Sequence, residues 1–461
     1  MKAIRTYMNF TKGVDQAHIL TMSDLELSIA LATPLVEFNQ EREPVAALAE
    51  KWSYVQPNKI IFTLKSDLKW SDGSAITAKQ YKESLDRAAA TYPDDLRALF
   101  DSISKIEAPD DRTLIFITKG EVTHSGVLLK LTEPMYGLTN LKNGKINPSV
   151  SSGAYYLKSS SDDELILSAN EHWYQFNKQM PGSVFIRRPA SGLDLVESFP
   201  NDSWANLISG TSLMKLSTEA KLSAAGLKTW HRTLDKTFSL FPSKAFIQNG
   251  GADFIKLLST KIKIETLMDG LSGYTKAEQF FPRGYDLWSS VPVGILEVAP
   301  SKIKKVKIII PDNFYAVTFK ERLEKIVKSE TGVSAECELV SLSQINDRMK
   351  KGDFDVMATS FAVADPNFEG AMSFFIERQP APIQSSDAPL DFANQTKTAR
   401  SLATIQERAQ SMRTIIVRAQ KAGFVLPLFH FSSLTVAKPG VNISSVPNTD
   451  ETVLFSKVKM E

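Results

Sequence analysis

The order of strands and helices between residues 306 and 361 constrains the fold more than any other feature of this chain. Three short runs with strand character, at residues 306–310, 334–340 and 354–361, are separated by two stretches with apolar residues at helical spacing. Strands that alternate with helices through short connections form parallel sheets with right-handed crossovers. Ligands bind outside the carboxyl ends of such strands, so residues 361–368 are expected to lie at a cleft.

A further loop, helix and strand are expected towards the end of the chain. Residues 377–396 are rich in Pro, Ser, Gln and Asp, which predicts a long surface loop. An amphipathic helix should follow, stop before Gly423, and lead into an apolar strand at residues 425–431. The residues expected on the apolar face of this helix are Leu402, Ile405, Ala409, Met412, Ile416 and Ala419.

The length and the net charge of the chain indicate how many lobes and which kinds of partner to expect. The chain has 461 residues, so two or three lobes are expected, because one domain usually holds about 100–200 residues. Its net charge of +2 indicates neither a nucleic acid nor an anionic membrane as partner. Cys337 is the only cysteine, which excludes an internal disulfide and predicts a buried thiol. No apolar run approaches the roughly 20 residues that cross a bilayer, and no secretory leader is evident.

Motifs for catalysis or for metal binding are missing from the sequence. The chain contains no G-x-S-x-G, no G-x-x-x-x-G-K-S/T and no G-x-G-x-x-G pattern. No two of its five histidines form a local pair of metal ligands. A peptide hydrolase would need a nucleophile beside a base, and no spacing indicates one. We therefore expect a protein that is not an enzyme and that has no cofactor and no metal site.

Two sequence motifs stand out in the first 80 residues. Residues 44–52 read PVAALAEKW, and residues 69–78 read KWSDGSAITA. Residues 60–65, between the motifs, are β-branched and aromatic and predict a strand. Thr77, with Gln80 three residues later, forms the pattern of a capping box, so a helix should begin at Ala78.

These motifs resemble the extracytoplasmic solute-binding proteins of ABC importers, family 5, which include oligopeptide-, dipeptide- and nickel-binding proteins. The family pattern runs roughly P-x-L-A-E-x-W, a strand pair, and W-S-D-G-x-P-x-T-A. Further matching segments are residues 151–157, 352–366 and 425–431, so that the resemblance covers about residues 20 to 435. The chain departs from the pattern at Ala75, where the family has Pro, and at Phe361, where it has Trp.

The resemblance implies an α/β fold: the bilobal periplasmic-binding-protein fold, type II and cluster C-like, with a β-rich insert in the first lobe. The chain should cross between the lobes near residues 233–240 and return near residues 426–434. The expected segments are 1–45, 151–235 and 431–461 for the first lobe, 46–150 for the insert, and 236–430 for the second lobe.

The resemblance also implies a set of ligand-binding residues. In the family, an Asp after the strand that ends at Phe361 can receive a peptide's amino terminus, through charge-assisted hydrogen bonds. Here Asp365 is the acidic residue of that segment, and a turn before Pro366 or a helix cap explains it equally well. His430 is explained as well by a structural role. The expected ligand-binding residues are Ser23, Asp24, Phe361, Ala362, Asp365, Phe368 and His430.

On this resemblance we expect a monomeric solute-binding protein. It would capture a peptide or peptide-like small solute in a cleft between its lobes and deliver it to an ABC import permease at the membrane. Its location would be periplasmic or extracytoplasmic, although this chain shows no leader and a cytoplasmic location stays open. The alternative is a sensing or regulatory module of the same fold that is not coupled to import.

Overall fold

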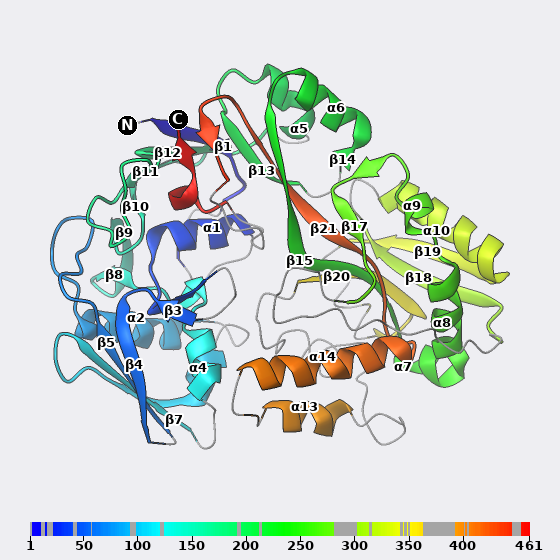
Figure 1. Cartoon of the computed structure of the whole chain (residues 1–461), viewed down its shortest axis with the longest axis horizontal. Coiled ribbons are helices and arrows are strands. Elements are labelled where there is room, and N and C mark those ends of the chain that lie inside the picture. Colours follow the sequence, from blue (N-terminus) through cyan, green and yellow to red (C-terminus); the bar gives the residue numbers. More distant parts are fainter. Residues whose placement is uncertain are drawn as a thin grey trace. The chain divides into compact units, whose positions relative to one another are not determined.

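The chain divides into two compact units in the computed structural model (Figure 1). Unit 1 comprises Met1–Thr211, Ala220–Trp230 and Leu434–Glu461, and unit 2 comprises Ser212–Glu219 and His231–Ser433. The structure describes residues 2–10, 14–15, 22–39, 44–56, 58–92, 98–119, 124–190, 195–211, 214–280, 302–312, 316–341, 344, 348, 351–362, 392–400, 402, 405–444 and 453–461. The main divisions between the units fall after Trp230 and after Ser433.

One core of unit 1 joins the two ends of the chain. A four-stranded sheet runs in the order β1 (Ala3–Tyr7), β12 (Ser183–Arg187), β11 (Glu164–Ala169) and β10 (Tyr155–Ser160), and β1 pairs parallel with β12. Helix α1 (Met22–Leu31) buries Leu27 and Leu31 in this core. Val441, Phe455 and Val458 from the last part of the chain pack in the same cluster.

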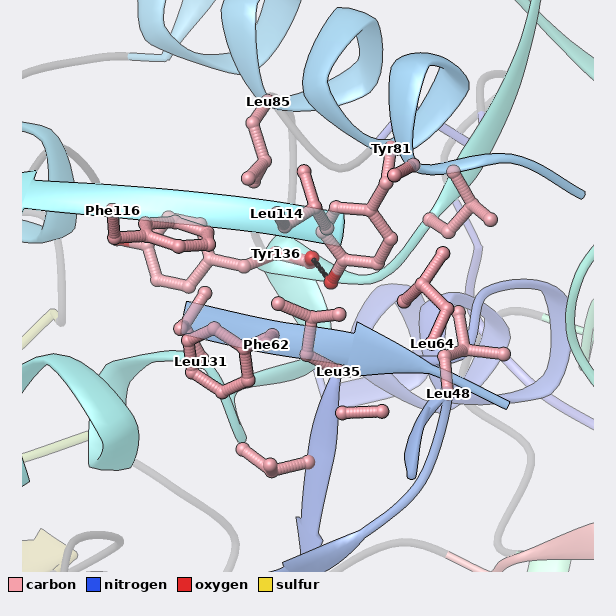
Figure 2. Close-up of a cluster of buried hydrophobic side chains, with 14 of the residues drawn as sticks. Leu35, Leu48, Phe62, Leu64, Tyr81, Leu85, Leu114, Phe116, Leu131 and Tyr136 are labelled. Atoms are coloured by element: carbon pink, nitrogen blue, oxygen red, sulfur yellow. Dashed lines mark hydrogen bonds between the residues drawn. The ribbon is translucent and has the colours of Figure 1, made fainter. Parts of the chain in front are cut away.

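A second core of unit 1 lies in an antiparallel subdomain. Its sheet runs in the order β4 (Ala49–Gln56), β5 (Lys59–Leu64), β7 (Thr113–Thr118) and β6 (Ile103–Glu107). Alternate residues of β5 and β7 are buried, as strands with one covered face require. Figure 2 shows Phe62 and Leu64 of β5 and Leu114 and Phe116 of β7 gathered with Tyr81 of helix α2 (Ala78–Thr91).

The predicted start of helix α2 is confirmed. Thr77 adopts an extended conformation, its side chain accepts from the Gln80 backbone N–H, and the Gln80 side chain accepts from the Thr77 backbone N–H. This capping box satisfies two backbone groups that a helix start would leave unpaired. The predicted apolar face is also confirmed, since Ala78, Tyr81, Leu85 and Ala88 are buried.

The parallel sheet predicted from residues 306–361 is confirmed in unit 2. Strand β18 (Lys305–Pro311) pairs parallel with β19 (Ser334–Val340) on one side and with β20 (Val356–Ala362) on the other. Helix α10 (Ala316–Thr331) connects β18 to β19 and is followed by Gly332, whose φ of +74° favours glycine. Most of the second predicted helix, around residues 343–351, lies outside the described residues.

Two long strands extend this sheet and carry the chain from one unit to the other. The order is β13 (Leu207–Thr211), β21 (Leu426–Ala437), β15 (Lys228–Pro242), β20, β18 and β19, and β17 (Tyr274–Lys276) also pairs with β21. Helices α8 (Ala252–Lys261) and α9 (Ile264–Leu267) contribute to the core of unit 2 together with α10. The rings of Phe238 on β15 and Phe429 on β21 stack in that core, with centroids 5.1 Å apart.

The predicted loop at residues 377–396 is wrong in its last part. Helix α13 begins at Phe392 and ends at Arg400, whereas residues 377–391 lie outside the described residues. Thr396 and Ala399 are buried, and α13 packs beside α14 (Ile405–Lys421). The loop was predicted from composition, but tertiary packing on α14 outweighs the weak helix propensity of Asn and Thr in this segment.

The remaining helices and strands of the described chain are short. They are β2 (Val36–Phe38), β3 (Pro44–Ala46), α3 (Ala98–Ser102), α4 (His124–Lys130), η3 (Pro134–Tyr136), β8 (Thr139–Lys142), β9 (Lys145–Ser151), α5 (Leu195–Ser198), η4 (Phe199–Asn201), β14 (Met214–Lys215), α6 (Leu216–Ala224), α7 (Lys244–Phe246), η5 (Ile247–Gly251), β16 (Leu271–Ser272), β22 (Val441–Asn442), η7 (Phe455–Lys457) and β23 (Lys459–Met460).

Candidate functional site

Ser23 and Asp24 lie in the first turn of α1, in unit 1. Ser23 is half-buried, and Asp24 is 7% exposed and therefore buried. A carboxylate in the first turn of a helix interacts favourably with the backbone N–H groups there. Asp24 therefore has a structural role at the helix start that is independent of any ligand.

Phe361 and Ala362 are the last two residues of β20, in unit 2. Their backbones pair antiparallel with Thr237 and Lys236 of β15. The predicted position of these two residues, at the carboxyl end of a strand in a mainly parallel part of the sheet, is thus confirmed. Asp365 and Phe368 lie outside the described residues, so their roles stay predictions.

His430 lies within β21, with only 4% of its surface exposed. Its Nδ1 is 2.8 Å from Oγ1 of Thr237 on the neighbouring strand β15. The Thr237 hydroxyl has one proton, which it donates to the backbone oxygen of Phe280 at 2.7 Å. His430 must therefore carry a proton on Nδ1 and donate it to Thr237. This bond fixes the orientation of the imidazole, which is the structural role that the sequence left open.

We give the name polar row of unit 2 to Thr275, His430, Thr237 and Phe361, which lie on neighbouring strands of the sheet. Across the sheet, Thr275 of β17 pairs with His430, and Thr237 pairs with Phe361. The segment that precedes the undescribed residues 281–301 contacts this row, because Thr237 Oγ1 donates to Phe280 O. Two predicted residues, Phe361 and His430, thus lie in one row across the sheet.

A residue that the sequence did not single out lies on helix α14. Arg413 is 1% exposed, and among the described residues its Nε, Nη1 and Nη2 atoms find no hydrogen-bond partner. Burial lowers the pKa of this guanidinium from its ordinary value. Arg413 interrupts the apolar residues of the helix, and an arginine in a helical pattern is normally assigned to the exposed face. Sequence pattern therefore gave no signal for it.

Helix α14 is hydrogen-bonded to the segment that contains Glu278 and Phe280. The Gln420 side chain donates through Nε2 to the backbone oxygen of Glu278 at 3.1 Å, two residues before Phe280. The helix ends before Gly423, as predicted. Gly423 has a φ of +81°, and its backbone lies so close to the Ala252 backbone that a side chain would not fit there. Leu402, predicted as its first apolar residue, precedes the helix, which begins at Ile405.

Within the described ranges, the structure shows neither a cluster of metal-binding side chains nor a reactive thiol. No group of three or more His, Cys, Asp or Glu side chains in those ranges could hold a metal ion. Cys337 is buried, as predicted, and burial raises its pKa to about 12, so that it stays a thiol at neutral pH. No helix among the described residues is long and apolar enough to cross a membrane.

Comparisons with known proteins show which fold this is. Residues 43–187 match the family model described as bacterial extracellular solute-binding proteins, family 5, middle. No curated protein matches the chain in sequence. Many solved structures match it in fold, over its whole length. The segment matched by the family model contains the β4–β5–β7–β6 subdomain and the strands that flank it.

Three solved structures illustrate the likeness, each covering 100% of this chain. NikA from Brucella suis in complex with Fe(III)-EDTA has a TM-score of 0.80 at 16% identity, over 100% of that chain. The murein tripeptide binding protein MppA of Escherichia coli has a TM-score of 0.72 at 15% identity, over 98% of that chain. OppA from Haemophilus influenzae in complex with RPPGFSPFR has a TM-score of 0.69 at 15% identity, over 99% of that chain. The predicted bilobal α/β fold is confirmed.

Proposed function

We propose that this chain is a family 5 extracellular solute-binding protein, which captures a small solute or short peptide and delivers it to an ABC import permease. The observation that carries the proposal is the likeness in fold to solute-binding proteins over 100% of the chain, together with the family segment at residues 43–187. No observation on the described residues favours a sensing role over transport.

The chemical class of the solute is not selected by the fold. The similar structures include a murein tripeptide binding protein, an OppA in complex with RPPGFSPFR and a NikA in complex with Fe(III)-EDTA. We infer a peptide or peptide-like solute for this chain because its motifs resemble those of the peptide-binding branch. In this proposal Asp365 receives the amino terminus of the solute, and Ser23, Asp24, Phe361, Ala362, Phe368 and His430 line its site.

The proposed cycle is a change between an open and a closed arrangement. A ligand closes such a protein because it binds one arrangement better than the other. The backbone passes from unit to unit within β15 and β21, next to Trp230 and Leu434, and we place the hinge there. In this proposal the protein acts outside the cytoplasm as a monomer and has no catalytic step, because capture and release need none.

Native mass spectrometry on freshly purified protein tests the proposal. The expected result is an adduct of a few hundred daltons that is released on denaturation and fragments as a peptide or a related solute. Adding the released solute back to stripped protein should raise the melting temperature, because ligand that binds only the folded state stabilises it by about 2.7 kcal/mol at a hundredfold excess over Kd. A clean mass, with no thermal shift from any peptide pool or family solute, would contradict the proposal.

A further inference from the structure

Two Asn-Gly pairs occur in the sequence, Asn143-Gly144 and Asn249-Gly250, and no other asparagine is followed by glycine. In such a pair the backbone nitrogen of the glycine can reach the side-chain amide carbon of the asparagine, because glycine has no Cβ to obstruct the approach. Both pairs lie within the described residues. The structure therefore shows one reactive dipeptide in two different surroundings, and only one of them permits the backbone rotation that the reaction needs.

Asn143 and Gly144 form the turn between strands β8 and β9, which Figure 1 labels. Lys142 and Lys145 are the last cross-strand pair before the turn, so the loop has two residues. The φ angles of Asn143 and Gly144 are +53° and +73°, and a type I′ turn requires positive φ angles at both of its central residues. The amide nitrogen of Gly144 thus lies beyond the last pair of the β-ladder.

The tip of this hairpin is exposed and lies outside the two hydrophobic cores of unit 1. The residues from Lys142 to Lys145 are all exposed, and none of them belongs to either core. A Cβ placed on Gly144 would meet no atom of the described residues within 4 Å, its chain neighbours aside. Segments with few buried contacts open locally at a low cost in free energy. The backbone of Asn143 can therefore rotate, and bring the Gly144 nitrogen onto the side-chain carbon, without disturbing the rest of the unit.

Asn249 and Gly250 lie in the helical segment between α7 and α8, where the same rotation is hindered. Asn249 is exposed too, but its Nδ2 donates to the backbone oxygen of Ala245 at 2.9 Å. Gly251, the next residue, is buried, and a Cβ there would lie 2.5 Å from the backbone oxygen of Phe246. A rotation about Asn249 would break the hydrogen bond to Ala245 and move Gly251 against Phe246. Both asparagines are thus exposed, but only the backbone of Asn143 can rotate easily.

We propose that Asn143 is a site of spontaneous deamidation, a covalent modification in which water is the only co-reactant. The Gly144 nitrogen loses its proton and forms a bond to Cγ of Asn143, the Cγ–Nδ2 bond breaks, and Nδ2 leaves with this proton as ammonia. Water then opens the cyclic imide. Addition at Cγ gives aspartate, and addition at the backbone carbonyl carbon gives isoaspartate, in which the main chain runs through Cβ and Cγ. No electrons are gained or lost, so the reaction needs no oxidant or reductant.

The modification changes the charge and the length of the turn. Both products carry a carboxylate next to Lys142 and Lys145, and opposite charges nearby favour its ionised form. Isoaspartate also adds a carbon atom to the backbone of a turn whose twist fits two residues, so the pairing of Lys142 with Lys145 should loosen. Because the tip lies outside the cores, deamidated protein should melt within about 2 °C of fresh protein. A larger fall would contradict the placement of the modification at the tip.

The test measures the uptake of oxygen from labelled water. Native protein is incubated in mildly alkaline buffer prepared with heavy-oxygen water and is then digested at acid pH in ordinary water, and mass spectrometry locates the label in the peptides. Label should enter at Asn143 about tenfold or more faster than at Asn249, because the second site reacts only in locally opened protein. In urea both pairs lose their surroundings, and the two rates should agree within about threefold.

Matched variants identify the source of the acidic form that isoelectric focusing detects after the incubation. Asn143→Gln should abolish this form, because the longer side chain closes its ring far more slowly, and Asn249→Gln should leave it unchanged. The proposal is overturned if Asn143 gains no label, if Asn249 gains it as fast, or if the acidic form persists in Asn143→Gln. It is overturned too if the difference in rate survives in urea, since neighbouring residues and not the fold would then cause it. No step depends on the transported solute, so the outcome is independent of the proposed function.

Discussion

Unit 1 and unit 2 differ in whether their buried side-chain polar atoms find hydrogen-bond partners within the described residues. In the β4–β5–β7–β6 subdomain of unit 1, the Tyr81 hydroxyl donates to Tyr136 O at 2.7 Å, and the Tyr92 hydroxyl donates to Met135 O. Within the described chain, the buried side-chain polar atoms that find no partner belong to unit 2. They lie on Ser239, Ser272, Arg413, Gln420 and Ser433. Unmet polar atoms lower stability, and they are expected where a ligand completes the bonding.

The largest loss of stability is expected when an aromatic ring is removed from the core of the β4–β5–β7–β6 subdomain. Phe116 is fully buried, and its ring meets that of Phe62 edge-on with centroids 5.4 Å apart. Phe116→Ala should lower the free energy of unfolding by about 3–5 kcal/mol, because it leaves a cavity. Urea denaturation measures this loss. The control Tyr54→Ala, at a side chain that is 47% exposed, should lose less than about 0.5 kcal/mol. Equal losses in both variants would show that the core is not packed as described.

Removing one hydroxyl from the same core tests whether its polar groups are needed. Tyr81→Phe leaves the Tyr136 oxygen without its donor, so the free energy of unfolding should fall by about 1–3 kcal/mol. Burial also raises the pKa of Tyr81, so the folded state keeps a proton that the unfolded state loses above about pH 10. Wild-type stability should therefore fall as the pH rises beyond 10, and less steeply in Tyr81→Phe. A variant as stable as the wild type would mean that the bond contributes nothing.

The ion pair between Arg348 and Glu338 in unit 2 contrasts with the buried polar atoms of that unit that lack partners, and acid titration tests this contrast. The Arg348 side chain bonds Glu338, whose side chain is 41% exposed, and holds the pKa of Glu338 at about 2. The folded pKa lies below the unfolded value, so this stabilisation is present above about pH 4.5 and is lost as the pH falls to 2. Arg348→Met should cost less than about 1 kcal/mol at neutral pH. Its urea midpoint should then decline less than that of the wild type between pH 4.5 and 2.

The smallest expected effect has the opposite sign. Ser239 lies on β15, and its buried hydroxyl has no hydrogen-bond partner in the described structure. Ser239→Ala should therefore leave the free energy of unfolding unchanged or raise it by up to about 0.5 kcal/mol. Thr237→Val, two residues earlier, removes a hydroxyl with two partners and should lower stability by about 1–3 kcal/mol. Comparable losses of unfolding free energy in both variants would show that the Ser239 hydroxyl has a partner. The contrast between the buried polar atoms of the two units would then not hold.

The fold was predictable wherever local pattern and tertiary packing agree. The alternating residues of β5, the capping box at Thr77 and the strand–helix–strand order from β18 to β20 are local signals, and each corresponds to an observed element. Helix α13 was missed because packing on α14, and not the residues of α13 themselves, stabilises it. The family motifs supplied the bilobal fold, which periodicity alone does not distinguish from other α/β folds.

The candidate site was less predictable, because pairing between distant polar groups leaves no periodic trace. His430 and Thr237 are 193 residues apart in the chain, and only the sheet brings their side chains to 2.8 Å. Arg413 was not singled out, since charged residues in amphipathic helices are usually exposed. Position at the end of β20 identified Phe361, because strand ends follow from topology.

The core that contains Ile4 also contains Phe455, with consequences for synthesis and folding. Tyr155 donates to Phe455 O at 3.4 Å across 300 residues, and Val453 N–H donates to Glu26 at 3.0 Å across 427 residues. Because a chain emerges from the ribosome amino terminus first, this core stays incomplete until residues 441–458 have been synthesised. Folding with contacts so distant in sequence is slow. Loss of residues 441–461 would remove Val441, Phe455 and Val458 from the core that contains Ile4.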